Sequence, residues 1–151
     1  MQFDKAGLEK VLTELKPYNA TLVAVSKTKP VAAIKEVYDT GQKDFGENYV
    51  KELTGKTAEL PEDIHWHFIG HLQSNKVKTI ASFISLIHGV DSFALLKEIN
   101  KQGKKHNRSI DCLLQIYIAE EETKFGLTVD EAEEILRTRS FIRLKIFASG
   151  V

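Results

Sequence analysis

Apolar and polar residues follow two different periods along this chain. Residues 7–16 place leucine and valine at helical spacing, which predicts an opening helix that ends near Pro17. After it, short β-branched runs alternate with helical patterns at spacings of roughly 20 to 25 residues. The predicted strands cover residues 21–27, 43–48, 64–70, 86–91, 111–119 and 142–149. The predicted helices cover residues 30–41, a segment ending near 59, residues 74–83 and 92–105, and a segment from 128 onward.

This alternation predicts an α/β fold in which right-handed helical crossovers join parallel strands. Such a fold is either an open doubly wound sheet or a barrel, and periodicity does not separate the two. No linker or low-complexity tract interrupts the pattern, so residues 1–151 are predicted to form a single domain. A complete eight-unit barrel takes about 250 residues. This chain contains about five and a half βα units.

The composition is that of an ordinary globular protein. Among 151 residues, 42% are hydrophobic and 28% are charged, and 21 basic residues balance 21 acidic ones. A neutral chain offers no broad field to nucleic acid or anionic lipid, so we expect neither as a partner. The single cysteine, Cys112, lies in an apolar run and predicts a buried thiol in a reducing compartment. The N-terminus is amphipathic and no apolar run reaches about 18 residues, so we expect a cytoplasmic protein.

Lys27 is the first candidate for chemistry, because parallel α/β proteins carry their sites at the carboxyl ends of strands. It closes the first predicted strand, and strand alternation places it on the same face as Val23 and Val25. In a barrel this face leads to the mouth of the interior, where an apolar base would favour the neutral amine. A neutral lysine amine attacks an aldehyde and forms a Schiff base. The alternative is a solvated or ion-paired lysine.

Polar residues also follow the later predicted strands. Asn48 ends the segment FGEN and offers an amide to a ring oxygen, or else serves a turn or a helix cap. His67 lies on the third strand, ahead of an expected helix N-cap at Ser74 or Asn75. Lys124 follows the fifth strand, either as a cation of the site or as a solvated loop lysine.

A paired-histidine motif supplies a different interpretation. His65 and His67 share one face of the third predicted strand, and an H-x-H pair at that place binds a metal in barrel hydrolases. The further ligands would have to come from His88, Asp91 or the acids at 120–122, so we expect no metal and keep a metal-dependent barrel hydrolase as an alternative. GxGxxG, Walker, GxSxG and CxxC motifs are absent, which leaves the common nucleotide, hydrolase and zinc interpretations without support.

Four segments together resemble a known family. VSKTKP at 25–30, FGENYVKE at 45–52, WHFIGHLQSNK at 66–76 and KFGL at 124–127 occur in the order found in pyridoxal phosphate homeostasis proteins. The resemblance runs from about residue 5 to about residue 145, and its second and third motifs are long. It implies the fold of the alanine racemase N-terminal domain. The expected fold is therefore an incomplete (β/α)8 TIM-type barrel of about six parallel strands with an extra N-terminal helix.

The resemblance also implies a cofactor, pyridoxal 5′-phosphate, held as a Schiff base on Lys27. It places Asn48 and His67 at strand ends that face this cofactor, and Lys124 in the loop after the fifth strand. The implied role is to bind and buffer pyridoxal phosphate in vitamin B6 homeostasis, without catalytic turnover. The alternative is a racemase-like enzyme, which would need an acid or base on the opposite face of the cofactor, such as Tyr49 or Tyr117.

The chain departs from the family pattern in two places. Tyr117 stands near the end of the fifth predicted strand, where family members generally carry asparagine. The family pattern also continues to a serine-containing loop and an R-I-G-x-x-x-F-G motif, which supply a phosphate cup, whereas this sequence ends at Val151. We therefore expect a C-terminally truncated barrel that holds phosphate less tightly. Its open edges at strands one and six would favour a homodimer or another interaction with a second chain.

Overall fold

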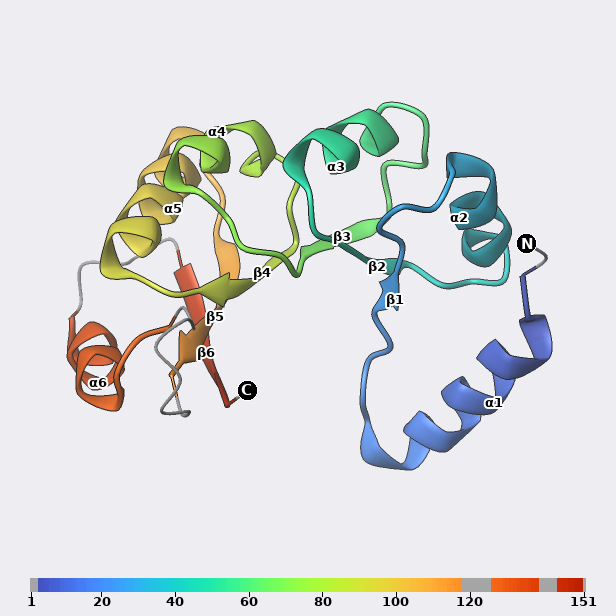
Figure 1. Cartoon of the computed structure of the whole chain (residues 1–151), viewed down its shortest axis with the longest axis horizontal. Helices are drawn as coiled ribbons and strands as arrows, with labels where there is room; N and C mark the ends of the chain where they lie inside the picture. Colours follow the sequence, from blue (N-terminus) through green and yellow to red (C-terminus); the bar gives the residue numbers. More distant parts are fainter. Residues whose placement is uncertain (1–2, 118–125, 139–143, 151) are drawn as a thin grey trace. The chain divides into compact units, whose positions relative to one another are not determined.

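The structure, a computed structural model, describes residues 3–117, 126–138 and 144–150, which fall into two compact units, 1–66 and 67–151. The boundary between the units divides β3 (His65–Phe68). Before β3, the first unit contains α1 (Lys5–Leu15), η1 (Lys16–Tyr18), β1 (Ala24–Val25), α2 (Val31–Tyr38), β2 (Asp44–Glu47) and α3 (Val50–Thr57) (Figure 1). After β3, the second unit contains η2 (Ser74–Lys76), α4 (Val77–Ile80), β4 (Leu86–Val90), α5 (Phe93–Lys105), β5 (Ile110–Ile116), α6 (Val129–Arg137) and β6 (Leu144–Gly150).

The strands are parallel and follow their order in the chain, which confirms the predicted α/β alternation. In the first unit β1 pairs with β2, so that Ala24 lies opposite Phe45. In the second unit β3 pairs with β4, β4 with β5, and β5 with β6. The β4–β5 register shifts between Ile87 and Val90. Parallel pairing places the carboxyl ends of neighbouring strands at one edge within each unit.

Side-chain caps fix several predicted helix starts. The Asp4 carboxylate caps α1 by accepting a hydrogen bond from the Gly7 N–H at 2.9 Å. Ser92 caps α5 in the same way. Thr128 caps α6 and forms a capping box with Glu131. Such caps satisfy N–H groups that have no partner inside the helix, which is why the predicted starts near 92 and 128 are confirmed.

Two predicted elements are shorter than expected. The first strand is hydrogen-bonded only as β1, Ala24–Val25, and the segment before it is extended without being a strand. The helix predicted over 74–83 consists of η2 and the four-residue α4. The N-cap expected at Ser74 or Asn75 is wrong, because Gln73 occupies that position and makes no side-chain cap bond. The hydroxyl and amide signals at 74–75 therefore mark a 3₁₀ turn.

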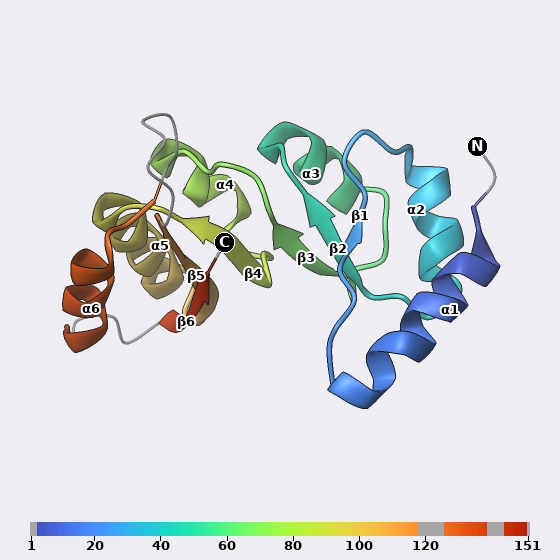
Figure 2. The same ribbon diagram turned by 60° about the horizontal axis from the view of Figure 1, so that its bottom comes forward.

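In the first unit, the core forms between β2, α2 and α3. Phe45 and Trp66 are buried, with ring centroids 6.1 Å apart, and Leu53 of α3 is fully buried. By contrast, α1 has no buried residue, and an extended segment joins it to β1 (Figures 1 and 2). The opening helix predicted from its periodicity is confirmed, but its apolar stripe contributes little to this core.

In the second unit, α4 and α5 lie side by side against the strands. The buried apolar side chains of this unit include Phe68, Ile80, Ile84, Ile87, Leu95, Leu96, Ile99, Ile110 and Leu114. Branched aliphatic residues on consecutive parallel strands are typical of a sheet covered by helices. No helix that the structure describes is both long and apolar enough to cross a membrane.

Truncating Leu96 to alanine is expected to lower the free energy of unfolding by about 2–5 kcal/mol, because its fully buried side chain would leave a cavity. Leu136→Ala on α6 is the matched control, since Leu136 is 55% exposed and its loss should change stability by less than about 0.5 kcal/mol. Urea denaturation followed by circular dichroism measures both variants. Equal losses in the two variants would contradict the assigned core.

The thiol of Cys112 is buried in β5, as the sequence predicts. Burial, with a smaller contribution from the neighbouring Asp111 carboxylate, raises the pKa of this thiol to about 12. We therefore expect iodoacetamide to leave the folded protein unmodified at neutral pH, because thiolate is the reactive form. Mass spectrometry should show the adduct only after unfolding in urea. Rapid modification of the folded chain would show that β5 opens readily.

Candidate functional site

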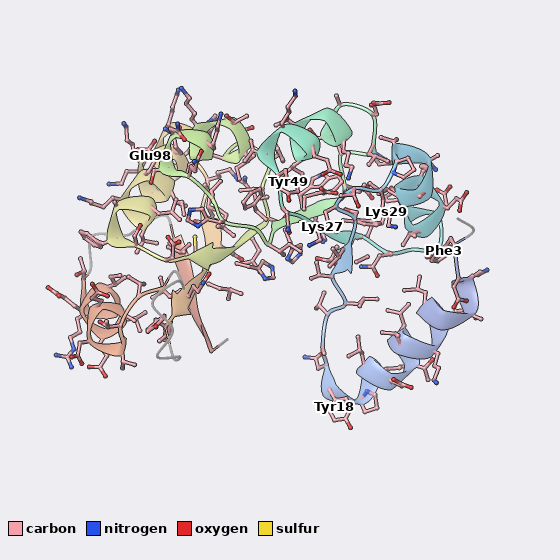
Figure 3. All side chains as sticks on the ribbon, in the orientation of Figure 1. Phe3, Tyr18, Lys27, Lys29, Tyr49 and Glu98 are labelled. Atoms are coloured by element: carbon pink, nitrogen blue, oxygen red, sulfur yellow. The ribbon has the colours of Figure 1, made fainter. Side chains whose placement is uncertain are left out.

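Lys27 lies in a tight turn that follows β1 in the first unit. The Lys29 N–H donates to the Ser26 carbonyl oxygen at 3.0 Å and closes the turn. Thr28 has a φ of 63°, a left-handed conformation that β-branched residues rarely adopt. Figure 3 labels Lys27 and Lys29 on the segment that leaves β1. The Lys27 side chain is exposed to solvent, so a small molecule can reach its amine.

The apolar base expected beneath Lys27 is not formed within the first unit. Val25, which shares its face in the alternation of the strand, is 55% exposed, and Val23 is half-buried. Strand alternation correctly separated this face from that of Ser26, which is buried. The prediction that the face with Val25 and Lys27 would be buried came from barrel geometry. Within the first unit, no element covers Val25 fully.

A buried charge cluster, consisting of Glu47, Lys56 and Glu52, supports the turn. The Lys56 ammonium donates to Glu47 Oε1 and to Glu52 Oε1, at 2.6 Å each. It also donates to the Ser26 carbonyl oxygen at 2.8 Å. The Ser26 hydroxyl donates to Glu47 Oε1 at 2.5 Å, and the Thr28 N–H donates to Glu52 Oε1 at 2.6 Å. Both residues that flank Lys27 are therefore held by this cluster.

Two members of the cluster are shielded from solvent, and the third is partly exposed. The side chains of Glu47 and Lys56 are 0% and 6% exposed, whereas that of Glu52 is 26% exposed. Hydrogen bonds from Lys56 and the Thr28 N–H lower the pKa of the Glu52 carboxyl, and desolvation opposes them. Glu47 Oε2 has no hydrogen-bond partner in the described part of the chain. An ion pair this deeply buried requires good geometry to offset the desolvation of both charges.

Asn48 follows β2 directly and lies in the first unit with Lys27. Its side chain is half-buried. The helix-cap alternative for Asn48 is wrong, because Tyr49 occupies the N-cap of α3 and no side chain makes a cap bond there. Its position at the carboxyl end of a strand agrees with the predicted place of a site residue, while its contact with a cofactor stays a prediction.

His67 lies on β3 in the second unit and pairs with a histidine of β4. Its Nδ1 lies 2.9 Å from Nε2 of His88, so one ring donates to the other. His67 is buried, and desolvation together with the charge of His67 lowers the pKa of His88. Because a protonated pair would place two positive charges in contact, at least one ring is neutral when this bond forms. The strand thus presents an imidazole pair that the sequence motif H-x-H did not predict.

Each histidine of the H-x-H motif has a partner among the described residues. His65 is exposed, and its Nδ1 lies 3.4 Å from Oδ1 of Asp44 in the first unit. In the second unit, His67 contacts His88. Among residues 3–117, 126–138 and 144–150, no three histidine, cysteine, aspartate or glutamate side chains gather as metal ligands. The metal-dependent hydrolase therefore gains no support from the described geometry.

Lys124 lies outside the described residues, so its predicted role stays a prediction. The end of its motif is described: Leu127 accepts a hydrogen bond from the Tyr117 N–H at 2.8 Å. A Cβ on Gly126 would lie 2.9 Å from the Tyr117 nitrogen, so only glycine allows this close approach. The motif thus has a packing role beside Tyr117, the residue that departs from the family pattern.

Sequence reasoning missed the role of the buried charge cluster. It assigned no role to Glu47, Glu52 or Lys56, although the first two lie in the motif FGENYVKE. One signal was available, since Glu52 and Lys56 are four residues apart and share a helix face, although such a pair is usually solvated. The contacts from this pair to the Lys27 turn required the fold, because they join residues up to 30 positions apart.

The fold and the site define a class of protein: a parallel α/β fold with an exposed lysine at the carboxyl end of its first strand. The model of the alanine racemase N-terminal domain matches residues 5–146, and this chain therefore belongs to that family. It is 40% identical over 123 residues to the pyridoxal phosphate homeostasis protein of Escherichia coli (strain K12), covering 79% of this chain and 53% of that protein. The Schizosaccharomyces pombe protein of the same name is 37% identical over 132 residues, covering 84% and 56%. The chain thus spans about half the length of the curated relatives it matches.

Solved structures give the fold. PipY of Synechococcus elongatus PCC7942, solved without PLP, superposes with a TM-score of 0.84 at 36% identity, covering 92% of this chain and 66% of PipY. The PLP-bound form of PipY gives 0.78 at 33% identity, covering 94% and 69%. Alanine racemase from Streptomyces coelicolor A3(2) gives 0.71 at 15% identity over 93% of this chain and 39% of that enzyme, which shows the fold alone. The predicted family and the predicted TIM-barrel fold class, with parallel strands and an additional N-terminal helix, are confirmed.

Proposed function

We propose that this chain binds pyridoxal 5′-phosphate (PLP) and holds it as a Schiff base on Lys27, acting in PLP homeostasis. The observation that carries the proposal is the position of Lys27, an exposed amine at a strand end in a turn whose two neighbours are hydrogen-bonded to Glu47, Lys56 and Glu52. PipY, at 33% identity, has been solved with PLP bound, and the curated relatives are named for PLP homeostasis. These names support the proposal because their alignments cover most of this chain.

The exposure of Lys27 at a strand end supports a role for its amine at the aldehyde end of PLP. A neutral Lys27 amine adds to the aldehyde carbon, a C=N bond forms, and the carbonyl oxygen leaves as water with the two amine protons. When bound, PLP supplies an electron-withdrawing ring conjugated to this bond. Asn48 is proposed to orient the ring, and His67 and Lys124 are proposed as further contacts.

The described residues offer fewer candidate ligands for the phosphate group of PLP than for its aldehyde. Arginine is a usual phosphate ligand. The Arg108 guanidinium precedes β5 and donates to the Ala81 carbonyl oxygen at 2.8 Å, and Arg137 lies on α6 beside Glu133. Neither of these two arginines, the ones within the described ranges, lies at the carboxyl end of a strand.

The test is to mix the purified chain with PLP, reduce it with borohydride, and map the modified peptide by mass spectrometry. We expect a single pyridoxyl group on Lys27, because reduction fixes the C=N bond as a stable secondary amine. An unlabelled Lys27, in a sample whose circular dichroism shows a folded chain, would overturn the proposal.

We further propose a carrier and not an enzyme. Racemisation needs an acid or base on each face of the cofactor. If the chain were a racemase, Tyr49 would be the candidate for this acid or base in the first unit, since it lies at the start of α3 and is 60% exposed (Figure 3). Incubation of the PLP-loaded chain with L-alanine, followed by chiral chromatography, decides between them: steady formation of D-alanine would favour the enzyme.

The proposal includes a cytoplasmic location and a homodimer. A free, buried Cys112 is typical of a reducing compartment. At the edge of the first unit, β1 pairs on one side with β2, and its Val25 is 55% exposed, which favours pairing with a second chain. Light scattering after size exclusion tests the dimer, and a monomeric mass at micromolar concentration would contradict it.

A further inference from the structure

The turn that carries Lys27 has an unfavourable backbone. Thr28 has a φ of 63°, and the branched Cβ of threonine makes this left-handed region costly. A lone peptide would leave such a conformation, because the hydrogen bond from the Lys29 N–H to Ser26 is compatible with other turn types. Something outside the turn must therefore hold Thr28 in place.

Glu52 is the group that holds it. Its Oε1 accepts the Thr28 N–H at 2.6 Å, and the same oxygen accepts the Lys56 ammonium at 2.6 Å. The Lys56 ammonium in turn holds the Ser26 carbonyl oxygen at 2.8 Å. The peptide groups before and after Lys27 are thus connected through one ammonium and one carboxylate. A hydrogen bond to a charged acceptor is stronger than a neutral one, so the connection is suited to hold a strained residue.

Glu47 fixes the ammonium from the other side. Its side chain is fully buried, and it accepts both Lys56 at 2.6 Å and the Ser26 hydroxyl at 2.5 Å. Lys56 is itself buried, so its Nζ has little freedom to move away from the turn. A buried ion pair of this kind seldom improves stability over apolar residues of the same size. Instead, the members of this ion pair hydrogen-bond to Ser26, the residue before Lys27.

We propose that Glu52, through the Thr28 N–H and Lys56, is a positioning residue that fixes the backbone of Lys27 and so the direction in which its side chain leaves the turn. The inference rests on the proposed function, since it assigns the cluster to the residue that takes PLP. Glu52 does not touch the cofactor in this proposal. It acts by keeping Thr28 left-handed, so that an aldehyde meets an amine already oriented for attack.

The first test compares Glu52→Ala with Glu52→Gln. The glutamine retains an oxygen that can accept the Thr28 N–H, whereas alanine removes the acceptor. On mixing with PLP, we expect the visible band of the Schiff base to form about tenfold more slowly in Glu52→Ala, and within about threefold of wild type in Glu52→Gln. Equal rates in wild type and both variants would overturn the inference and leave the proposed function intact.

A rescue variant separates positioning from general stability. Asparagine adopts the left-handed region more readily than threonine. Adding Thr28→Asn to Glu52→Ala should therefore restore most of the lost rate, even though the cluster is still broken. If the double variant forms the Schiff base as slowly as Glu52→Ala, Glu52 does not act through the conformation of Thr28.

A third measurement needs no cofactor. Trypsin cleaves after exposed lysines in mobile segments, and Lys27 lies in the turn and is followed by Thr28. In the PLP-free chain we expect cleavage after Lys27 to be about tenfold faster in Glu52→Ala than in wild type. Cleavage at Lys101, on α5 in the second unit, is the internal control and should not change. Faster cleavage together with an unlabelled wild-type Lys27 would count against the proposed function, whereas unchanged cleavage would count against the inference alone.

Discussion

Replacing Lys27 with alanine is expected to abolish the covalent attachment of PLP. The variant should show no visible Schiff-base band after mixing and no pyridoxyl peptide after borohydride reduction. The physical reason is that the cluster of Glu47, Glu52 and Lys56 holds both neighbours of Lys27, whereas Lys29, the other amine of this turn, follows Thr28 at the closing position. Absorbance spectroscopy and peptide mapping measure the loss.

The matched control is Lys29→Ala. Lys29 is exposed, as Lys27 is, and lies two residues away in the same turn, so it reports the background reactivity of a surface lysine toward an aldehyde. Its removal should leave the label on Lys27 unchanged. A band that survives in Lys27→Ala and disappears in Lys29→Ala would show that Lys29, and not Lys27, holds the cofactor.

Replacing Lys56 with methionine is expected to lower the free energy of unfolding by about 3–5 kcal/mol. Lys56 is the ammonium that compensates Glu47, whose side chain is fully buried and has one oxygen without a partner among the described residues. Methionine keeps an unbranched side chain, one atom shorter than that of lysine, but leaves that carboxylate uncompensated. Urea denaturation measured by circular dichroism gives the change.

Two further variants define the cause. Lys35→Met breaks an i,i+4 pair with Asp39 whose members are 49% and 56% exposed, and it should cost less than about 1 kcal/mol. A Glu47→Met, Lys56→Met double variant should regain part of the loss, because it removes both buried charges together. A loss below about 1 kcal/mol in Lys56→Met, equal to that in Lys35→Met, would mean that water reaches Glu47.

The element pattern was predictable because it depends on local periodicity. Apolar runs of β-branched residues located the strands, and Ser92 and Thr128 marked helix starts that the caps confirm. The predicted cap at Ser74 was wrong because Ser74 is the first residue of a short 3₁₀ turn, whose N-cap position is Gln73. The length of β1 was overestimated, since an apolar run shows which residues prefer extended backbone but not how many find a hydrogen-bonded neighbour.

The candidate site was predictable in part. Strand alternation placed Lys27 at a strand end and opposite in face to Ser26, which the burial of Ser26 supports. Alternation could not show that Val25 would be 55% exposed, because burial depends on which elements cover a face. The pairing of His67 with His88 likewise depends on the register of β3 against β4, which places His67 opposite Leu86.

By itself, the sequence determined the alternation of strands and helices, the place of Lys27 after the first strand, and the motifs shared with one family. Each of these depends on residues close together in the chain. Only the tertiary structure decided that Glu47, Glu52 and Lys56 meet beneath the Lys27 turn. The physical reason is that a buried charge is tolerated only where its partners come within hydrogen-bond distance, and Lys56 of α3 reaches both Glu47, nine residues away, and the Ser26 carbonyl oxygen, 30 residues away.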